Sequence, residues 1–456
     1  GRLRLEYDAG YEAKPHSPAL SLSMPLRGGP YGEAATSRWI SSLLPDHPRA
    51  LERWYKKEGV SSPFGLLASR IGYDCAGAVQ FCRPDRLSEL SDRSSGLTPL
   101  TSEDMAERVN AMAEDPAQWD SDDLESCYSL AGFQNKMALH RTPIGWARPH
   151  GSAPTTHILK PRHRDGGQAA VVEHLCAATA RRVGLDAVVT DVEFHGGHPV
   201  TVVQRYDRHR PDGPWRRRHQ EDMCQALGLD GRRRHEWDGG PGMGVIGDFM
   251  HRHCLDPDTD VRKFADGLLW ALITVNRDAH ARNYSLLLLG REVHMAPLYD
   301  LQSSLPYGVK HLGEREMAMR YGSTYSLYSA SSNHSLADVA ARLSLPTIWL
   351  IDRAEELAHA THEAMRAEIE GLSAEARGLL DVDGLLERLN IRAKAIASTV
   401  EANRARIHRR GGGPASDDAA SPDEGLDAAG ARVMFDESHS GTELLLPESD
   451  EDEASA

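Results

Sequence analysis

The sequence predicts an α+β fold with a β-rich N-terminal lobe, a mainly helical C-terminal lobe and a disordered acidic tail. Short apolar or alternating runs before residue 210 are typical of strands. Longer runs with helical periodicity dominate from about residue 260 to residue 407. The 456 residues exceed the size at which single cores stop growing, about 250 to 300 residues, so we expect more than one lobe.

Charge is distributed unevenly along the chain. The formal net charge is −15, but thirteen Asp or Glu residues and one Arg from Gly411 onward contribute −12, which leaves about −3 for the body. This tail is rich in Ser, Gly and Asp and poor in aromatic residues. It cannot bury enough apolar surface to offset the entropy cost of ordering, so we expect residues 411–456 to be disordered.

The composition also narrows the class of protein. Apolar residues make up 40% of the chain, and no apolar run approaches the roughly 18 residues that a membrane span requires, which argues against a membrane-embedded protein. The first residues contain no secretory signal, so the cytoplasm is the expected compartment. The six cysteines form no C-x-x-C pair and predict buried thiols rather than disulfides or a zinc site.

The N-terminal quarter combines several short elements. The alternation in residues 3–7 predicts a strand, and residues 36–44 predict a helix that ends before Pro45. Residues 83–125 are polar, with Ser94-Ser95-Gly96 in the middle and an acidic patch at residues 120–125. This composition predicts a linker.

The pattern is clearer from residue 129 onward. Residues 137–140, 156–160 and 200–205 predict strands, and residues 170–183 predict a helix closed by Gly184. This order of strand, strand, helix and strand is typical of a nucleotide-binding small lobe. After Gly239 the expected elements are mainly helices, over residues 260–275, 336–343, 347–371 and 382–407.

The densest group of reactive residues follows the helix predicted to end near Val275. Asp278 and Asn283 have the D-x-x-x-x-N spacing in which protein kinases place the catalytic base and a Mg²⁺ ligand. The apolar runs beyond Asn283 predict a hairpin that returns the chain to Asp300. Two such oxygen ligands suit Mg²⁺, which takes its other ligands from phosphate and water. The alternative is that Asp278 caps a turn and Asp300 caps a helix.

Two upstream features fit the same chemistry. A strand ends at Lys160, and Glu173 lies thirteen residues later on the predicted helix; kinases use such a pair to direct a lysine at the α- and β-phosphates. A surface charge is the alternative for Lys160. Residues 128–136 include Gly132 ahead of a strand, where backbone N–H groups can cradle phosphate. The more glycine-rich Gly239–Gly244 follows no strand lysine, so we interpret it as a turn and helix entrance.

Taken together, these segments closely resemble the HipA family of toxin kinases. The matching segments occur in family order and are Ser21–Leu26, Leu43–Asp46, Cys75–Val79, Ser129–Lys136, Thr156–Lys160, Gln204–Arg208, Gln220–Gln225, the Asp278 loop and Leu298–Asp300. The resemblance implies a protein-kinase-like bilobal fold. Its expected divisions are a HipA-type N-terminal subdomain over residues 1–95, an ATP-binding small lobe over 126–235, a helical catalytic lobe over 236–410 and the tail over 411–456. The chain begins where the family is on its second strand, which suggests a truncated start.

The resemblance also implies roles for individual residues. Asp278 is the expected catalytic base, Asn283 and Asp300 the expected Mg²⁺ ligands, and Glu173 the ion-pair partner of Lys160. Ser129 matches the serine that family members autophosphorylate to switch themselves off. The ATP-binding residues implied by the resemblance are Ala131, Gly132, Phe133, Gln134, Asn135, Lys136, Lys160, Gln204, Arg205, Tyr206, His280, Asn283, Tyr299 and Asp300.

The leading hypothesis is a kinase that transfers the ATP γ-phosphoryl group to Ser or Thr of a protein. The family resemblance implies a translation component such as an aminoacyl-tRNA synthetase as target. It also implies a helix-turn-helix HipB-like antitoxin as partner, DNA contact through that antitoxin, and no membrane partner. One alternative is a small-molecule kinase of the aminoglycoside or choline type, which shares the D-x-x-x-x-N loop. Another is a non-catalytic DNA-binding corepressor, motivated by the triplets Arg216–Arg218 and Arg232–Arg234.

Overall fold

The computed structural model describes most of the chain: residues 2–91, 96–115, 117–119, 128–161, 167–210, 213–307, 316–330 and 333–411. The expected disordered tail beyond residue 411 and the acidic patch at residues 120–125 lie outside these ranges. None of the described helices combines the length and the apolar character that crossing a membrane requires.

The N-terminal part of the chain is helical in its described residues. Its elements are α1 (Ala9–Glu12), α2 (Glu33–Ser42), α3 (Pro48–Glu58), α4 (Pro63–Leu67), η1 (Arg70–Tyr73), η2 (Pro84–Arg86) and α5 (Leu87–Ser91). Trp39 and Ile40 of α2 pack with Leu66 and Leu67 of α4 in a separate small core. The predicted strand at residues 3–7 was wrong. Leu5 forms only an isolated backbone bridge with Tyr31, because no described strand lies beside it.

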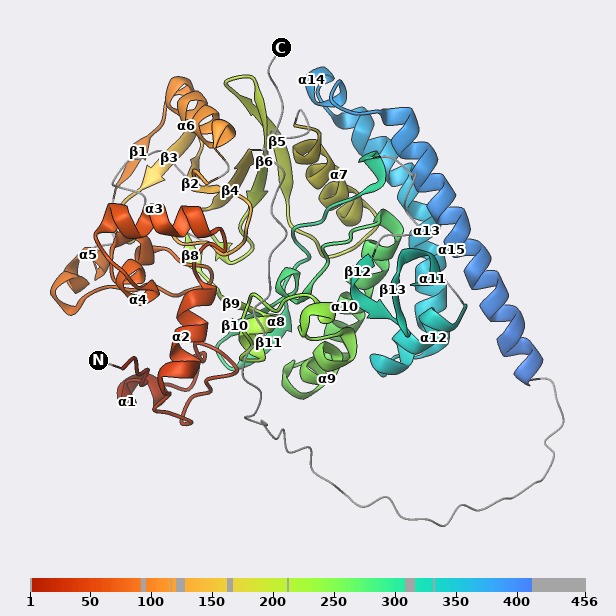
Figure 1. Cartoon of the computed structure of the whole chain (residues 1–456), viewed down its shortest axis with the longest axis horizontal. Coiled ribbons are helices and arrows are strands. Elements are labelled where there is room, and N and C mark those ends of the chain that lie inside the picture. The colour runs from red at the N-terminus through yellow and green to blue at the C-terminus, as the bar shows by residue number, and fades with distance from the viewer. Residues whose placement is uncertain are drawn as a thin grey trace, which may run out of the picture. The chain divides into compact units, whose positions relative to one another are not determined.

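The small lobe is built on a six-stranded antiparallel sheet with the strand order β1-β3-β2-β4-β6-β5. Its strands are β1 (Leu97–Pro99), β2 (Met137–Thr142), β3 (Gly145–Pro149), β4 (His157–Pro161), β5 (Thr190–His195) and β6 (His198–Gln204). Helix α7 (Gln168–Arg182) packs on β5 and β6 and buries ten of its residues (Figure 1). The three strands and the helix expected in this part are confirmed.

Residues 97–114 are not the linker that the polar composition predicted. They form β1, which pairs with β3, and helix α6 (Ser102–Glu114), which packs on β4 and β5. Thr101 and Asp104 form a reciprocal capping box, and this fixes the start of the helix. Met105, Val109 and Met112 lie on one helix face and are buried. This stripe of three apolar residues anchors an otherwise polar segment to the sheet.

The remaining part of the chain is mainly helical and surrounds a three-stranded sheet (Figure 1). Its longer helices are α9 (Met243–His253), α10 (Pro257–Thr274), α12 (Asn333–Arg342), α13 (Thr347–Gly371) and α15 (Val382–Gly411). Shorter elements are β7 (Arg208–His209), β8 (Arg216–Arg217), α8 (Met223–Ala226), η3 (Glu236–Asp238), η4 (Ala281–Asn283), η5 (Leu305–Tyr307), β12 (Glu316–Tyr321), β13 (Thr324–Ser326), α11 (Leu327–Ala330) and α14 (Ala374–Arg377). The bounds predicted for α13, residues 347–371, are confirmed. The prediction that Gly239–Gly244 forms a turn and a helix entrance is also confirmed, because Gly242 is the N-cap residue of α9.

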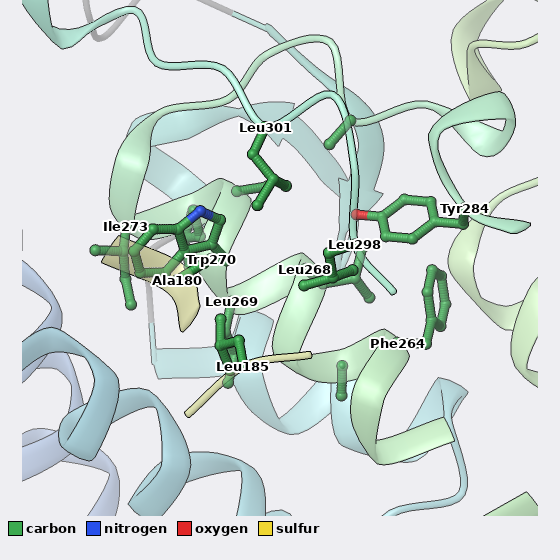
Figure 2. Packing of buried hydrophobic residues seen from close by; sticks show 14 of the residues in the cluster. Ala180, Leu185, Phe264, Leu268, Leu269, Trp270, Ile273, Tyr284, Leu298 and Leu301 are labelled. Atoms are coloured by element: carbon green, nitrogen blue, oxygen red, sulfur yellow. The ribbon is translucent and has the colours of Figure 1, made fainter. Parts of the chain in front are cut away.

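Helix α10 lies in the centre of the largest core and leads into the loop that carries Asp278. Its start is set by Asp256, whose side chain accepts a hydrogen bond from Thr259 N, and by Pro257 in the first turn. Phe264 meets Tyr284 edge to face with ring centroids 4.8 Å apart, and Leu268 and Trp270 are fully buried (Figure 2). Residues 267–274 of α10 are all buried, and this end of the helix cannot slide without opening cavities, so the loop that follows has a fixed origin.

A hairpin carries the chain away from this loop and back. Strands β10 (Ser285–Leu289) and β11 (Glu292–Met295) pair antiparallel, and β10 also pairs with β9 (His219–Asp222). The sheet order is β11-β10-β9. The return of the chain after β11 brings Asp300 to the same cavity as Asp278 and Asn283, as the apolar pattern predicted.

Candidate active site

A cavity of about 450 Å³ brings the expected site residues together. Its walls come from ten separate stretches of the chain, including the loop before β2, the end of β4, the end of β6 and the loop after α10. The expected residues that line it are Ala131, Gly132, Phe133, Gln134, Lys136, Lys160, Gln204, Arg205, Tyr206, Asp278, His280, Asn283, Tyr299 and Asp300. Of the expected nucleotide-binding residues, Asn135 does not line this cavity.

The loop that carries Asp278 is held by its own backbone and by one amide side chain. Asn283 Nδ2 donates to the Asp278 carbonyl oxygen at 2.6 Å, and the backbone N–H of His280 donates to the same oxygen at 2.8 Å. The Asp278 side chain itself is 59% exposed. Its carboxylate therefore stands at the solvent edge of the cavity, where a hydroxyl group of a large substrate can reach it.

Lys160 lies between two carboxylates deep in the cavity. Its Nζ atom is 2.6 Å from Glu173 Oε1 and 2.7 Å from Asp300 Oδ1. Gln302 donates a further hydrogen bond to Glu173 at 3.1 Å. Burial alone would lower the pKa of Lys160, but Asp300 and Glu173 outweigh it and raise the pKa. The lysine is therefore a fixed positive charge, and its predicted pairing with Glu173 is present.

The chemistry of Asn283 and Asp300 fits a magnesium ion. Both residues offer oxygen atoms, the ligands that Mg²⁺ prefers, and both line the same cavity as Lys160. Asn283 uses its Nδ2 atom for the Asp278 carbonyl, so its Oδ1 atom is the one left to face a cation. Asp300 has a φ of 55°, a left-handed conformation that aspartate tolerates better than most residues.

The loop before β2 closes one side of the cavity. Lys136 Nζ donates to the Ala131 carbonyl oxygen at 2.7 Å, and burial together with the nearby charge of Lys160 lowers the pKa of Lys136 to about 8. Gly132 has a φ of 115°, and a Cβ atom there would lie only 2.4 Å from Lys136 Nζ. The positive φ therefore favours glycine at this position, and a Cβ atom there would also displace the Lys136 ammonium group.

Asn135 and Ser129 lie on the same loop but point elsewhere. Asn135 Nδ2 donates to the carbonyl oxygens of Met112 and Gln118, so its side chain fastens the loop to α6. Ser129 is fully buried, and its Oγ atom donates to the Leu43 carbonyl oxygen at 2.6 Å. In this conformation neither side chain can touch a nucleotide in the cavity.

The segment after β6 has one side chain in the cavity and one turned away from it. The Tyr206 ring stacks on Tyr299 with centroids 5.7 Å apart, and its hydroxyl group donates to Gln220 at 2.6 Å. Arg205 is buried instead in an ion network, with its guanidinium group 2.8 Å from both Asp207 and Thr155. Any contact of Arg205 with a nucleotide must therefore come from its backbone.

Several residues around the cavity were not predicted. Arg282 is buried and pairs with Asp46 at 2.6 Å and Asp222 at 3.3 Å, and the pair with Asp46 joins the Asp278 loop to the N-terminal part of the chain. His235 Nε2 lies 3.3 Å from Asp278 Oδ1, although 43 residues separate the two in sequence. Asp46 is the last residue of Leu43–Asp46, a segment that resembles the family, and this match is the sequence signal for it. His235 lies in none of the matching segments.

Two family models match this chain. The family model for the HipA-like C-terminal domain matches residues 128–369, and the model for the HipA N-terminal domain matches residues 1–82. The putative kinase Y4mE of Sinorhizobium fredii is 34% identical over 315 residues, which cover 68% of this chain and 73% of that protein. The serine/threonine-protein kinase toxin HipA of Shewanella oneidensis is 28% identical over 366 residues, covering 76% and 80%.

A solved structure shares the fold. It is the Shewanella oneidensis complex of HipA, HipB and operator DNA, in which the matched chain gives a TM-score of 0.74 at 24% identity, with 88% of this chain and 94% of that chain covered. The likeness confirms the bilobal fold expected from the sequence. The family models cover both lobes, and the relatives are kinases by name. The chain therefore belongs to the HipA family of kinases.

Proposed function

We propose that this protein transfers the γ-phosphoryl group of Mg²⁺-bound ATP to a serine or threonine of a protein substrate. The observation that carries the proposal is the convergence of Asp278, Asn283, Asp300 and Lys160 on one cavity from three separate parts of the chain. Phosphoryl transfer depends mainly on positioning and charge stabilisation, and these four residues supply both.

Each residue has a definite task in this reaction. Lys160 and Lys136 attract the phosphate groups, since both ammonium groups lie in the cavity. Asp278 accepts the proton of the substrate hydroxyl as the new O–P bond forms and the bond to the leaving ADP oxygen breaks. Magnesium held by Asn283 and Asp300 would supply charge neutralisation on the transferred group.

The exposed position of Asp278 supports a protein as the acceptor. A small-molecule kinase encloses its acceptor in a pocket, whereas the Asp278 carboxylate is 59% exposed at the cavity edge. A macromolecule can present a hydroxyl group there without entering the cavity. By family resemblance we propose a translation component, such as an aminoacyl-tRNA synthetase, as the substrate, which places the reaction in the cytoplasm.

The proposed partner is a small helix-turn-helix antitoxin related to HipB. The support is the Shewanella oneidensis complex, in which a protein of the same fold is combined with HipB and operator DNA. Contact with DNA would then be made through the antitoxin. We also propose the division of the chain that the sequence predicts. Residues 1–95 are the HipA-type N-terminal subdomain, 126–235 the ATP-binding small lobe, 236–410 the helical catalytic lobe and 411–456 the acidic tail.

Ser129 is proposed as the autophosphorylation site that switches the kinase off. Its hydroxyl group is buried against Leu43, so a phosphate group with a charge of about −1.5 to −2 cannot be accommodated in this conformation. The modified loop must leave its place, which removes Gly132 and Lys136 from the cavity. Phosphorylation and an intact nucleotide site are thus mutually exclusive.

The test is the intact mass of the purified protein after incubation with Mg²⁺ and ATP. We expect a gain of one phosphate, located at Ser129, in the wild type and none in Asp278→Asn. Asp258→Asn, an exposed carboxylate in the first turn of α10, is the matched control and should behave as the wild type. Phosphoproteomics of cells that express the wild type or Asp278→Asn then identifies the substrate. Equal phosphorylation by both would refute the role of Asp278.

A further inference from the structure

His235 and His280 flank the Asp278 carboxylate at the edge of the cavity, and the phosphoryl-transfer chemistry gives no role to His235. One ligand atom from each residue lies within 4.8 Å of the other two. His235 Nε2 is 3.3 Å and His280 Nε2 is 3.7 Å from the same atom, Asp278 Oδ1. Among the described residues, this is the one group of three such side chains close enough to hold a metal ion.

We propose that this cluster is an inhibitory site for a divalent transition metal of the Zn²⁺ class, which captures the catalytic carboxylate as a ligand. Bonds of about 2.0 to 2.2 Å at the tetrahedral angle place neighbouring ligand atoms roughly 3.3 to 3.5 Å apart. The two distances to Asp278 Oδ1 are already close to this value. Only the two histidines must approach each other, which rotation of one imidazole can achieve.

The donor set distinguishes this site from the magnesium site nearby. Two imidazole nitrogens and one carboxylate suit zinc and similar metals, whereas Mg²⁺ prefers oxygen ligands. Asn283 and Asp300 offer only oxygens, so the two sites select different metals.

The surroundings fix one histidine ring and leave the other less supported. The His235 ring stacks on Trp237 at a centroid distance of 4.8 Å and meets the His280 ring edge to face at 5.0 Å. The Nδ1 atom of His280 is buried with no hydrogen-bond partner. Histidine ligands usually donate that proton to an acceptor, and losing such support costs about 10- to 100-fold in affinity. We therefore expect micromolar binding, which suits a reversible inhibitor better than a permanent structural ion.

The consequence for the reaction follows from the shared carboxylate. A dication on Asp278 Oδ1 occupies the lone pair that would accept the substrate proton and strongly disfavours protonation of the carboxylate. The metal and the proton of the substrate compete for one group. This inhibitory effect rests on the proposed function, but metal binding itself does not.

The direct test is titration of the purified full-length protein with Co²⁺, a spectroscopic substitute for Zn²⁺. We expect one equivalent to produce the intense visible absorption of a tetrahedral centre. His235→Phe keeps a ring against Trp237 but removes a ligand, and it should weaken Co²⁺ binding at least tenfold. His253→Gln, an exposed histidine outside the cluster, is the matched control and should bind as the wild type. Equal Co²⁺ binding by the wild type and His235→Phe would overturn the proposal.

A kinase assay at constant Mg²⁺ and ATP tests the inhibition. Micromolar Zn²⁺ should suppress the wild type, and His235→Phe, measured against its own zinc-free rate, should need at least tenfold more. If His235 only orients Asp278, the variant will have a lower zinc-free rate but unchanged sensitivity to Zn²⁺, and the metal site is refuted. If the wild type has no kinase activity at all, the proposed function fails while the Co²⁺ spectrum still decides the metal site.

Discussion

Asp74 is the centre of a buried ion network whose disruption should be among the most costly single substitutions in this protein. Its Oδ1 atom is 2.8 Å from the guanidinium groups of both Arg208 and Arg217, and its Oδ2 atom accepts from Thr155 Oγ1 at 2.6 Å. Asp74 and Arg208 are at most 2% exposed. The network joins the helical N-terminal part to the segment after β6 that borders the nucleotide cavity.

We expect Asp74→Asn to cost about 3 to 5 kcal/mol of unfolding free energy, the range for breaking a buried ion pair by removing one partner. The amide keeps the size of the side chain but removes the charge and turns an NH₂ group toward donors of Thr155 or the arginines. At roughly 2 to 4 °C per kcal/mol, the melting temperature should fall by roughly 10 °C. Differential scanning calorimetry and urea unfolding at pH 7 measure both quantities.

The matched control is Asp85→Asn, whose carboxylate forms an exposed pair with Arg83 at 3.1 Å and should contribute less than about 1 kcal/mol. The pH dependence supplies a second check. Burial alone would raise the pKa of Asp74, but the arginines outweigh it and lower the pKa, so the stabilisation is present above the unfolded value of about 3.9. It is lost only as the pH falls below that value. A loss at pH 7 no larger than that of Asp85→Asn would refute the reasoning.

Three further substitutions test other parts of the structure. Burial raises the pKa of Glu221 to about 8, so the folded state holds an extra proton between about pH 4.5 and 8 and its stability falls as the pH rises through that window. Glu221→Gln should remove this slope in melting temperatures measured from pH 5 to 8.5, and an unchanged slope would contradict it. Glu173→Gln removes an ionic partner of Lys160 and should weaken binding of a non-hydrolysable ATP analogue about tenfold in calorimetry, whereas wild-type affinity would show that the pair is dispensable. Gly132→Ala should displace the Lys136 ammonium group and weaken the same analogue, and it should also lower the melting temperature because a φ of 115° is strained for alanine; equal affinity would mean that the loop adjusts freely.

Local patterns in the sequence were sufficient for the elements that direct the chemistry. Helix α13 and strands β2, β4 and β6 were predicted close to their bounds, because apolar periodicity and terminating residues act over a few neighbours. Asp278 and Asn283 are five residues apart, so both lie in one loop and contact each other. Lys160 and Glu173 are thirteen residues apart, one at the end of a strand and the other on the helix that packs on the same sheet. These short-range relations identified Lys160, Asp278, Asn283 and Asp300, and the family resemblance supplied the other predicted residues that line the cavity.

Weaker local signals led to errors. The polar composition of residues 97–114 hid the three buried apolar residues of α6, since a linker and a helix with one narrow apolar stripe have similar compositions. The alternation at residues 3–7 predicted a strand, but a strand also needs a neighbour with which to pair. Composition and alternation indicate which secondary structures a segment can form. Its contacts with other segments decide which one it forms.

The sequence by itself predicted the Asp278 loop, the pairing of Lys160 with Glu173, and the order of strands and helices that carry them. Only the tertiary structure decided that Arg282 reaches Asp46, that three arginines surround Asp74, and that His235 lies beside Asp278. These contacts join residues 43 to 236 positions apart. They depend on how the lobes pack against one another, which no local spacing records.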